Sequence, residues 1–471
     1  MKFASFRDPI GRVFFDRKSV IRVLSKEAHA TLDEFRSLDI TQSWEADGTI
    51  VSTDLVDPAS VPPLLNGDAP LVSDGEVLSH PRVWFPSYAH EWPAEMLAAA
   101  GELTLDIAAS LLTKGWGLKD ATPFNILFNG TRPMFIDVLS FEKRESADPI
   151  WLPYQQFVNT FLLPLLVNKR RQVSLRSVFL SNRDGLDVAE AGGYFSGASK
   201  LNPKVFSMVT LPKMLSSKAE KTSGLYSERR KMSAEQAQFI MRQTFRRLEK
   251  QLAGVSPDPG RDSKWTGYTE HNVSTIPAYM LAKQRFVENA VNGLQPKHVL
   301  DVGCNTGYFS FFAARSGAKV VGIDHDPAVV GQVWRDAVSE KLDVLPLVVD
   351  LSRPSPRMGW RNSELPSFLD RAEGSFDLVM MLAILHHIIV QERIPLNEVL
   401  KLAADLTTDS LIIEFVPPTD PLFRRIARGR DHLHADLNRE VFETAGREFF
   451  TIVRSEPLPE TDRVLYLLKK K

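Results

Sequence analysis

The chain has 471 residues, more than one hydrophobic core normally holds, so its length predicts two or three domains. The formal net charge of −1 gives no general reason to expect a nucleic-acid partner or an anionic membrane surface. The single cysteine, Cys304, excludes a disulfide within the chain and a metal site built from cysteines.

Residues 1–200 predict a domain that mixes helices with short strands. Strand candidates span residues 13–15 and 20–24, where β-branched and aromatic side chains are concentrated. A helix is expected from Glu95 to Lys114, because its apolar residues recur close to the 3.6-residue period.

Asp120, Asn125 and Asp137 form the candidate site of this N-terminal part. Asp120 and Asn125 are five positions apart, and Asp137 lies twelve positions further on, after the apolar run 133–136. This order resembles the catalytic loop and the metal-binding aspartate of the protein-kinase-like fold. The resemblance implies an α+β kinase-like domain with Asp120 as base, Asn125 and Asp137 as Mg²⁺ ligands, and ATP as the nucleotide.

The sequence departs from the kinase pattern at several points. Leu118 replaces the usual histidine, and Val138-Leu139 replaces Phe-Gly. No glycine-rich loop is evident, and Arg22, the nearest candidate for the phosphate-binding lysine, comes early in the chain. The alternative is an ordinary α/β loop, in which Asp120 caps a turn and Asn125 bonds to the backbone.

Residues 201–264 predict a helical linker. Ser233 and Gln236 have the spacing of a capping box, which indicates that a helix begins there. One side of this helix is apolar, and the other carries arginines and a lysine that either face solvent or contact phosphate. Residues 255–263 contain two prolines and a glycine and predict a turn-rich connection.

The most informative pattern is Asp301-x-Gly303-x-Asn305-x-Gly307, which follows an apolar run and precedes a helix-like segment. A second apolar run ends in Asp324, 23 residues after Asp301. The order is strand, glycine turn, helix, strand, and an acid at the tip of the second strand can accept hydrogen bonds from a ribose diol. The pattern therefore predicts a nucleoside cofactor.

Asp301 decides between the nucleoside cofactors. A pyrophosphate-binding turn has glycine at this position, and a carboxylate there would repel the phosphates but suit a cationic ligand. The spacing resembles the first motif of the class I S-adenosylmethionine-dependent methyltransferases, and the resemblance extends over residues 265–471. It implies an α/β fold, a Rossmann-like, seven-stranded, doubly wound sheet that binds S-adenosylmethionine.

Other residues take their roles from that resemblance. Asp324 falls where the family binds the ribose hydroxyls, Asp350 falls where it often contacts the adenine, and residues 376–387 resemble its fourth-strand motif. The alternative is that these acids and glycines merely end strands of another doubly wound domain. The pairing of the two parts also resembles a family of two-part bacterial-type proteins, some labelled as nodulation-related, in residues 79–92, 119–125 and 413–417.

Three residues are catalytic candidates: His386, His387 and Glu414. Methyl transfer requires an in-line arrangement, and a base where the acceptor loses a proton. The histidines follow the fourth strand, at the edge where open α/β sheets bind substrates; alternatively, one of them packs beneath the cofactor. Glu414 lies in the apolar fifth strand, where a carboxylate either accepts a substrate donor or pairs with a cation such as Arg424.

Two further segments are expected to border this site. Residues 424–434, rich in arginine and histidine, are either a solvated helix end or a surface that recognises an anionic acceptor. His432 and His434 lack a third ligand at a recognisable spacing, so no metal site is predicted there. Trp265 and Tyr279 either shield the sulfonium or pack a helix on the sheet.

These patterns predict methyl transfer to an unidentified acceptor, with residues 1–200 binding the acceptor or regulating the reaction. The alternative is a kinase-like phosphotransferase or nucleotide sensor. The sequence selects neither an acceptor class nor an oligomeric state. A cytoplasmic location is expected, because residues 1–8 lack the apolar stretch of a signal peptide and the apolar run 161–167 is too short to cross a bilayer.

Overall fold

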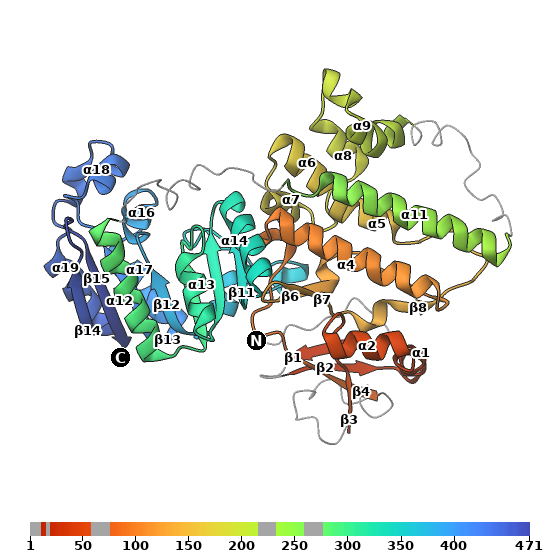
Figure 1. Ribbon diagram of the computed structural model, residues 1–471, viewed down its shortest axis with the longest axis horizontal. Coiled ribbons are helices and arrows are strands. Elements are labelled where there is room, and N and C mark those ends of the chain that lie inside the picture. The colour runs from red at the N-terminus through yellow and green to blue at the C-terminus, as the bar shows by residue number, and fades with distance from the viewer. Residues whose placement is uncertain (1–10, 16–18, 58–75, 215–231, 259–276) are drawn as a thin grey trace. The chain divides into compact units, whose positions relative to one another are not determined.

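The chain divides into two compact units, one of residues 1–259 with 358–365, the other of residues 260–357 with 366–471. The computed structural model, traced in Figure 1, describes residues 11–15, 19–57, 76–214, 232–258 and 277–471. Among the described helices, none has both the length and the apolar composition needed to cross a bilayer. The finer boundaries expected at residues 200 and 264 stay a prediction.

The first unit begins with an antiparallel sheet in the order β1-β2-β4-β3. Its elements are β1 (Gly11–Phe15), β2 (Ser19–Leu24), α1 (Lys26–Arg36), α2 (Asp39–Asp47), β3 (Asp54–Val56) and β4 (Glu76–Pro81). Strands β1 and β2 confirm the two strands expected from the sequence. A small apolar cluster forms on this sheet from Phe14, Ile21, Val23 and Val77.

A long helix, α4 (Ala94–Leu112), follows the sheet and confirms the predicted helix to within two residues at each end. Most of its side chains are buried, since it forms the centre of the unit. Two short antiparallel pairs come next: β5 (Trp116–Leu118) with β8 (Phe141–Lys143), and β6 (Ile126–Asn129) with β7 (Arg132–Phe135). The loop that carries Asp120 and Asn125 therefore lies between β5 and β6.

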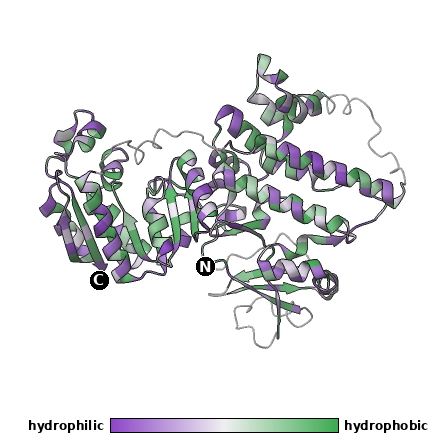
Figure 2. Ribbon diagram, viewed as in Figure 1, coloured by the Kyte–Doolittle hydropathy of each residue, from purple (hydrophilic) through white to green (hydrophobic). Residues whose placement is uncertain are grey.

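Helices complete the first unit. The shorter ones are α5 (Tyr154–Phe157), α6 (Leu163–Arg171), α7 (Leu175–Ser181), α8 (Val188–Gly193) and α9 (Pro203–Val205). The last, α11 (Ala234–Val255), starts with the predicted capping box, in which Ser233 and Gln236 each accept the other's backbone N–H. In Figure 2, purple and green alternate around α11, and its apolar side packs against α4. Its basic side is exposed, as expected for a solvated face.

The second unit contains a seven-stranded sheet in the order β11-β10-β9-β12-β13-β15-β14. The strands are β9 (His298–Val302), β10 (Lys319–Asp324), β11 (Val344–Val348), β12 (Phe376–Met381), β13 (Thr407–Phe415), β14 (Phe450–Pro457) and β15 (Val464–Lys470). The first five in the sheet order are parallel, and β15 is antiparallel to both of its neighbours. The predicted seven-stranded, mostly parallel sheet is confirmed.

Helices connect these strands and bury the sheet. They are α12 (Ala278–Leu294), α13 (Tyr308–Arg315), α14 (Pro327–Glu340), α15 (Phe368–Ala372), α16 (Leu385–Val390), α17 (Leu396–Leu406), α18 (Pro421–Ala427) and α19 (Arg439–Phe449). One core cluster joins α12, α13 and α14 to buried side chains of the strands. Because five strands are parallel, their carboxyl ends meet at one edge, where such sheets bind ligands.

Candidate active site

The carboxyl edge of the sheet collects the residues that the sequence singled out. Asp301 lies in β9 and precedes the glycine turn, Asp324 ends β10, and Asp350 follows β11. The two histidines lie in α16 after β12, and Glu414 lies near the end of β13. Their roles stay a prediction, but the sheet order places all of them on adjacent strands or the loops that follow.

The glycine turn after β9 leaves its backbone open to close approach by neighbouring atoms. Gly303 and Gly307 have positive φ angles of 71° and 83°, and Asn305 has a φ of 47° in the left-handed region that asparagine tolerates. A Cβ at Gly303 would lie 3.2 Å from the side chain of Ile384, and one at Gly307 would lie 2.9 Å from the ring of Phe311. Larger residues would therefore both strain the turn and displace its neighbours.

Asp301 is a buried carboxylate, 3% exposed. Among the described residues, its hydrogen bonds come from Ser310, whose Oγ donates to Oδ2 at 2.6 Å and whose backbone also contributes. Burial raises the pKa of Asp301 to about 6, although these bonds and the ammonium of Lys283 act in the opposite direction. A carboxylate in this state is costly to ionise unless a cation is bound beside it.

Asp324 is oriented by the backbone of its own loop. Its Oδ2 accepts the N–H of Asn305 at 3.2 Å, and its Oδ1 accepts the N–H of Asp326 at 3.0 Å. Nδ1 of His325 also lies 3.3 Å from Oδ1. A carboxylate has about four acceptor directions, so part of its capacity is left for a diol. The side-chain Oδ1 of Asn305 is buried without a hydrogen-bond partner in the described part of the chain. An unpartnered acceptor beside Asp324 fits a ligand that brings hydroxyl or ammonium donors.

Asp350 is less constrained than the other two acids. Its Oδ1 accepts the N–H of Ser352 at 2.9 Å, and Arg353 Nε lies 3.3 Å from Oδ2. The side chain is 34% exposed, so it remains accessible to a ligand at the end of β11. As hydrogen-bond acceptors, these three acids fit the amino, ribose and adenine ends of S-adenosylmethionine, which all carry donors.

The two histidines of α16 have different surroundings. His386 is 2% exposed, and neither ring nitrogen has a hydrogen-bond partner among the described residues. Burial, helped by the neighbouring His387, lowers the pKa of His386 to about 3. His387 is only partly buried, and burial lowers its pKa too. Both rings are therefore neutral near pH 7.

His387 has a hydrogen-bond partner one turn further along the chain, in Gln391. Its Nδ1 lies 3.2 Å from Oε1 of Gln391, and the tautomer that carries its proton on Nδ1 donates a hydrogen bond to this oxygen. Nε2 then keeps its lone pair. The two histidines thus differ: the ring of His386 is buried without a hydrogen-bond partner among the described residues, and the ring of His387 is oriented by Gln391.

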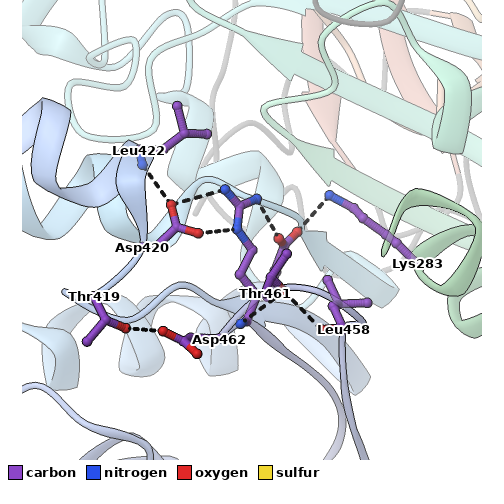
Figure 3. Close-up of polar contacts among 9 residues, drawn as sticks. Lys283, Thr419, Asp420, Leu422, Leu458, Thr461 and Asp462 are labelled. Carbon is purple, nitrogen blue, oxygen red and sulfur yellow. Dashed lines mark hydrogen bonds and ion pairs between the residues drawn. The ribbon is translucent and has the colours of Figure 1, made fainter. Parts of the chain in front are cut away.

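Glu414 is enclosed in a buried ionic network, drawn in Figure 3. Its Oε2 accepts from Nζ of Lys283 at 2.6 Å, and its Oε1 accepts from Arg463 at 3.1 Å. Burial acts to raise the pKa of Glu414, but the two cations outweigh it and hold the pKa below its usual value. Of the two expectations, pairing with a cation is the one observed, and Arg463 and Lys283 take the place suggested for Arg424.

The same arginine continues the network toward α18. Arg463 donates from Nε to Oδ2 of Asp420 at 2.7 Å and from a terminal nitrogen to Oδ1 at 3.2 Å. Asp420 Oδ1 also accepts the N–H of Leu422 at 2.8 Å and so caps α18. Lys283, Glu414, Arg463 and Asp420 therefore connect α12, β13, the β14–β15 turn and α18.

The first unit brings part of its predicted site together. Arg22 in β2 lies 3.0 Å from Oδ1 of Asp137, and Ser140 Oγ donates to Oδ2 of Asp137 at 2.9 Å. Asn125 donates from Nδ2 to Ser140 Oγ at 3.1 Å. Asp120 instead accepts from Nε2 of Gln156, at 3.3 Å. Arg22, although early in the sequence, is thus the cation that meets Asp137.

This cluster does not fit a magnesium ion as it is arranged. Both carboxylate oxygens of Asp137 are engaged, one of them by a guanidinium, which a divalent cation would have to displace. Within the ranges that the structure describes, no group of three or more His, Cys, Asp or Glu residues is placed to hold a metal. No phosphoryl-transfer step follows from this geometry.

Several residues of these sites were not found from the sequence. Ser310 lies in the first turn of α13, Gln391 follows the last residue of α16, and Ser140 ends a short 3-10 helix, so no motif marks them. Arg463 follows Glu414 by 49 residues in a turn, where spacing gives no signal. Asp420 did have a signal, because an acid before Pro421 is typical of a helix N-terminus.

Two further residues near the glycine turn and the sheet are packed in the second unit. Cys304 is buried, and burial raises its pKa well above the usual value, so the side chain is a packed thiol. Tyr279 packs against the core cluster of the second unit, as the simpler alternative expected. Trp265 lies outside the described residues.

Comparison with known proteins assigns the chain to a family. Residues 274–446 match the protein-family profile of a methyltransferase domain. The nodulation protein NoeA of Rhizobium meliloti (strain 1021) is 32% identical over 473 residues, which cover 99% of this chain and 95% of NoeA. The chain belongs to the NoeA family. Its second unit contains the methyltransferase domain.

This NoeA-family protein is similar to other proteins over shorter stretches. The O-antigen chain terminator bifunctional methyltransferase/kinase WbdD of Escherichia coli is 32% identical over 139 residues, which are 29% of this chain and 18% of WbdD. Among solved structures, the N-methyltransferase NodS from Bradyrhizobium japonicum WM9 has a TM-score of 0.31 and 14% identity, covering 41% of this chain and 96% of that one.

Proposed function

We propose that the second unit transfers a methyl group from S-adenosylmethionine to an acceptor bound at the carboxyl edge of its sheet. The observation that carries the proposal is Asp301, a buried carboxylate with a raised pKa beside a glycine turn. Such a group suits a cationic cofactor and repels a dinucleotide. When bound, S-adenosylmethionine supplies a methyl group activated by its sulfonium.

In this proposal, each of the three acids binds a different part of the cofactor. Asp301 compensates its positive charge, Asp324 with the unpartnered Asn305 Oδ1 accepts from the ribose hydroxyls, and Asp350 accepts from the adenine amino group. Support comes from the bonds that already orient Asp324 and from its unused acceptor capacity. Holding the cofactor in one orientation supplies most of what an in-line displacement requires.

His387 is the base in this proposal, where the acceptor has a proton to lose. Its Nδ1 proton is held by Gln391, so Nε2 is available to take the acceptor's proton. His386 is buried and positions its neighbour by packing, and Glu414 is a positioning residue because both of its oxygens are paired.

Calorimetry with S-adenosylmethionine tests the proposal. Asp324→Ala is expected to weaken binding by about tenfold to a hundredfold, since it removes charge-assisted hydrogen bonds. Asp343→Ala is the matched control, because Asp343 is an exposed acid at the amino end of β11. If the wild type shows no binding at millimolar cofactor, the proposal is wrong.

For the first unit, we propose a kinase-like module that binds the acceptor or regulates the reaction. The order of elements supports this: a small antiparallel sheet, the long helix α4, and then loops that bring Asn125 and Asp137 together. The Arg22–Asp137 pair is the reason to prefer this role to phosphoryl transfer. Magnesium-dependent ATP hydrolysis that disappears in Asp137→Ala would favour the alternative, a phosphotransferase or nucleotide sensor.

A further inference from the structure

Four arginines form an exposed cationic surface after β13. Arg424, Arg425, Arg428 and Arg430 lie within seven residues, and residues 421–430 contain no acid. All four are exposed, and none is ion-paired with a carboxylate in the part of the chain that the structure describes. The protein as a whole has a net charge of −1, so this surface does not reflect a generally basic composition.

Intrinsic stability does not explain this concentration of charge. Four like charges within seven residues repel one another, and no acid lies among them. The helix dipole favours Arg424 and Arg425, which lie in the last turn of α18. Arg428 and Arg430 lie beyond the end of the helix, and Arg428 has a φ of 49°, which is strained for a residue other than glycine.

The segment is nevertheless firmly anchored. Phe423 and Ala427 are buried in a cluster with Val416, so the apolar side of α18 is covered. Asp420, which caps α18, is held by Arg463, and Arg463 is held in turn by Glu414 (Figure 3). A buried ionic network of this kind fixes the position of α18 against the sheet.

The anchored surface borders the edge where methyl transfer is proposed. α18 follows β13, and it packs against α16, the helix that carries His386 and His387. β13 lies beside β12 in the sheet, so both helices leave the same carboxyl edge.

We propose that residues 424–430 bind an anionic oxygen group of the methyl acceptor, such as a phosphate or a carboxylate. Guanidinium groups pair with both through two parallel N–H···O bonds, which fix orientation as well as charge. The inference rests on the proposed function and narrows its substrate class: the methyl acceptor is an anion, and α18 holds it beside His387.

Matched charge-removal variants of the full chain test this. The test variant is Arg424→Gln/Arg425→Gln/Arg428→Gln, and the control is Arg242→Gln/Arg246→Gln/Lys250→Gln on the exposed face of α11 in the first unit. Each removes three exposed positive charges. Circular dichroism and calorimetry with S-adenosylmethionine are expected to match the wild type in both variants, because neither set contacts the cofactor residues.

The first readout is a direct one, with inorganic phosphate as the probe. Phosphate is expected to raise the thermal midpoint of the wild type and of the control above the value in chloride of equal ionic strength. The test variant is expected to lose this difference. A wild type without a phosphate-specific shift, or a shift kept by the test variant, overturns the proposal.

The second readout is labelling of a cell extract with an isotope-labelled methyl donor. The test variant is expected to label at least about tenfold less than the control, and the labelled product is expected to be retained on an anion exchanger. Prior treatment of the extract with phosphatase separates phosphate acceptors from carboxylates. The inference is wrong if the labelled product is neutral or if both variants label equally. It is also wrong if the same arginines bind anionic vesicles or RNA. Absence of cofactor binding instead overturns the proposed function.

Discussion

Two buried carboxylates in the same parallel sheet have opposite surroundings. Glu414 in β13 is paired through both oxygens, with Lys283 and Arg463, and its pKa is lowered. Asp301 in β9 receives hydrogen bonds from Ser310 within the described residues, and its pKa is raised to about 6. The protein pairs both oxygens of Glu414 with cations, whereas the ammonium of Lys283 only partly offsets the effect of burial on Asp301. Burial alone therefore does not distinguish the two carboxylates, whereas the pairing of their oxygens with cations does.

The largest expected effect comes from removing the paired charge. Glu414→Gln leaves Lys283 and Arg463 buried without an anion between them, so we expect a loss of about 3–5 kcal/mol in the free energy of unfolding, measured in urea. Glu392→Gln is the control, because Glu392 pairs with Arg353 at the surface and should cost less than about 1 kcal/mol. Equal losses of unfolding free energy in the two variants would show that the buried pairing of Glu414 contributes no more than a surface ion pair.

The pH dependence should come from Asp301. Burial raises its pKa to about 6 in the folded protein, above the unfolded value of about 4. The folded state therefore holds the proton more tightly, and stability is lost as the pH rises between these values, by about 3 kcal/mol. Asp301→Asn should abolish this part of the profile in urea unfolding from pH 4.5 to 7. An unchanged profile would show that another group titrates.

The next effect concerns the cofactor. Asp301→Asn keeps the shape of the side chain but removes its charge, so we expect S-adenosylmethionine to bind about tenfold to a hundredfold more weakly at pH 7. In the wild type, affinity should increase from pH 5 to 7 as Asp301 ionises. Calorimetry in buffers of different ionisation enthalpy would measure the released proton. A pH-independent affinity in the wild type would refute this role.

The smallest expected effect comes from Ser310, the hydrogen-bond donor to Asp301. Ser310→Ala removes the hydroxyl that donates to Asp301, and we expect a loss of about 1 kcal/mol in the free energy of unfolding at pH 7. The pKa of Asp301 should rise further, because the bond stabilises the charged form. The midpoint of the pH profile should then move upward, and a downward movement would count against the assignment.

The sequence predicted the sheet and the glycine turn well, for a local reason. The positive φ of Gly303 and Gly307 and the apolar runs before the acids are encoded within a few residues, so the pattern is visible without the fold. The two predicted strands and the helix of the first unit were found in the same way. Partners that the fold brings together were not found: Arg463 with Glu414, and Ser310 with Asp301.

Arg22 shows why contacts between residues far apart in the sequence could not be predicted from their spacing. Its place early in the chain counted against it, yet β2 carries it to Asp137, 115 residues away. Asn125 and Asp137, in contrast, were expected to lie together, and Ser140 links them. What they bind was not predictable, because the engagement of Asp137 by a guanidinium appears only in three dimensions.

The glycine at position 303 has one more consequence. Its missing side chain leaves 3.2 Å between a would-be Cβ and Ile384, the residue that immediately precedes α16. The glycine turn after β9 and the residue that precedes α16 therefore lie too close together to admit a methyl group between them without a shift of one or the other. If the proposed methyl transfer is correct, a side chain at position 303 would therefore disturb the start of α16 as well as the glycine turn.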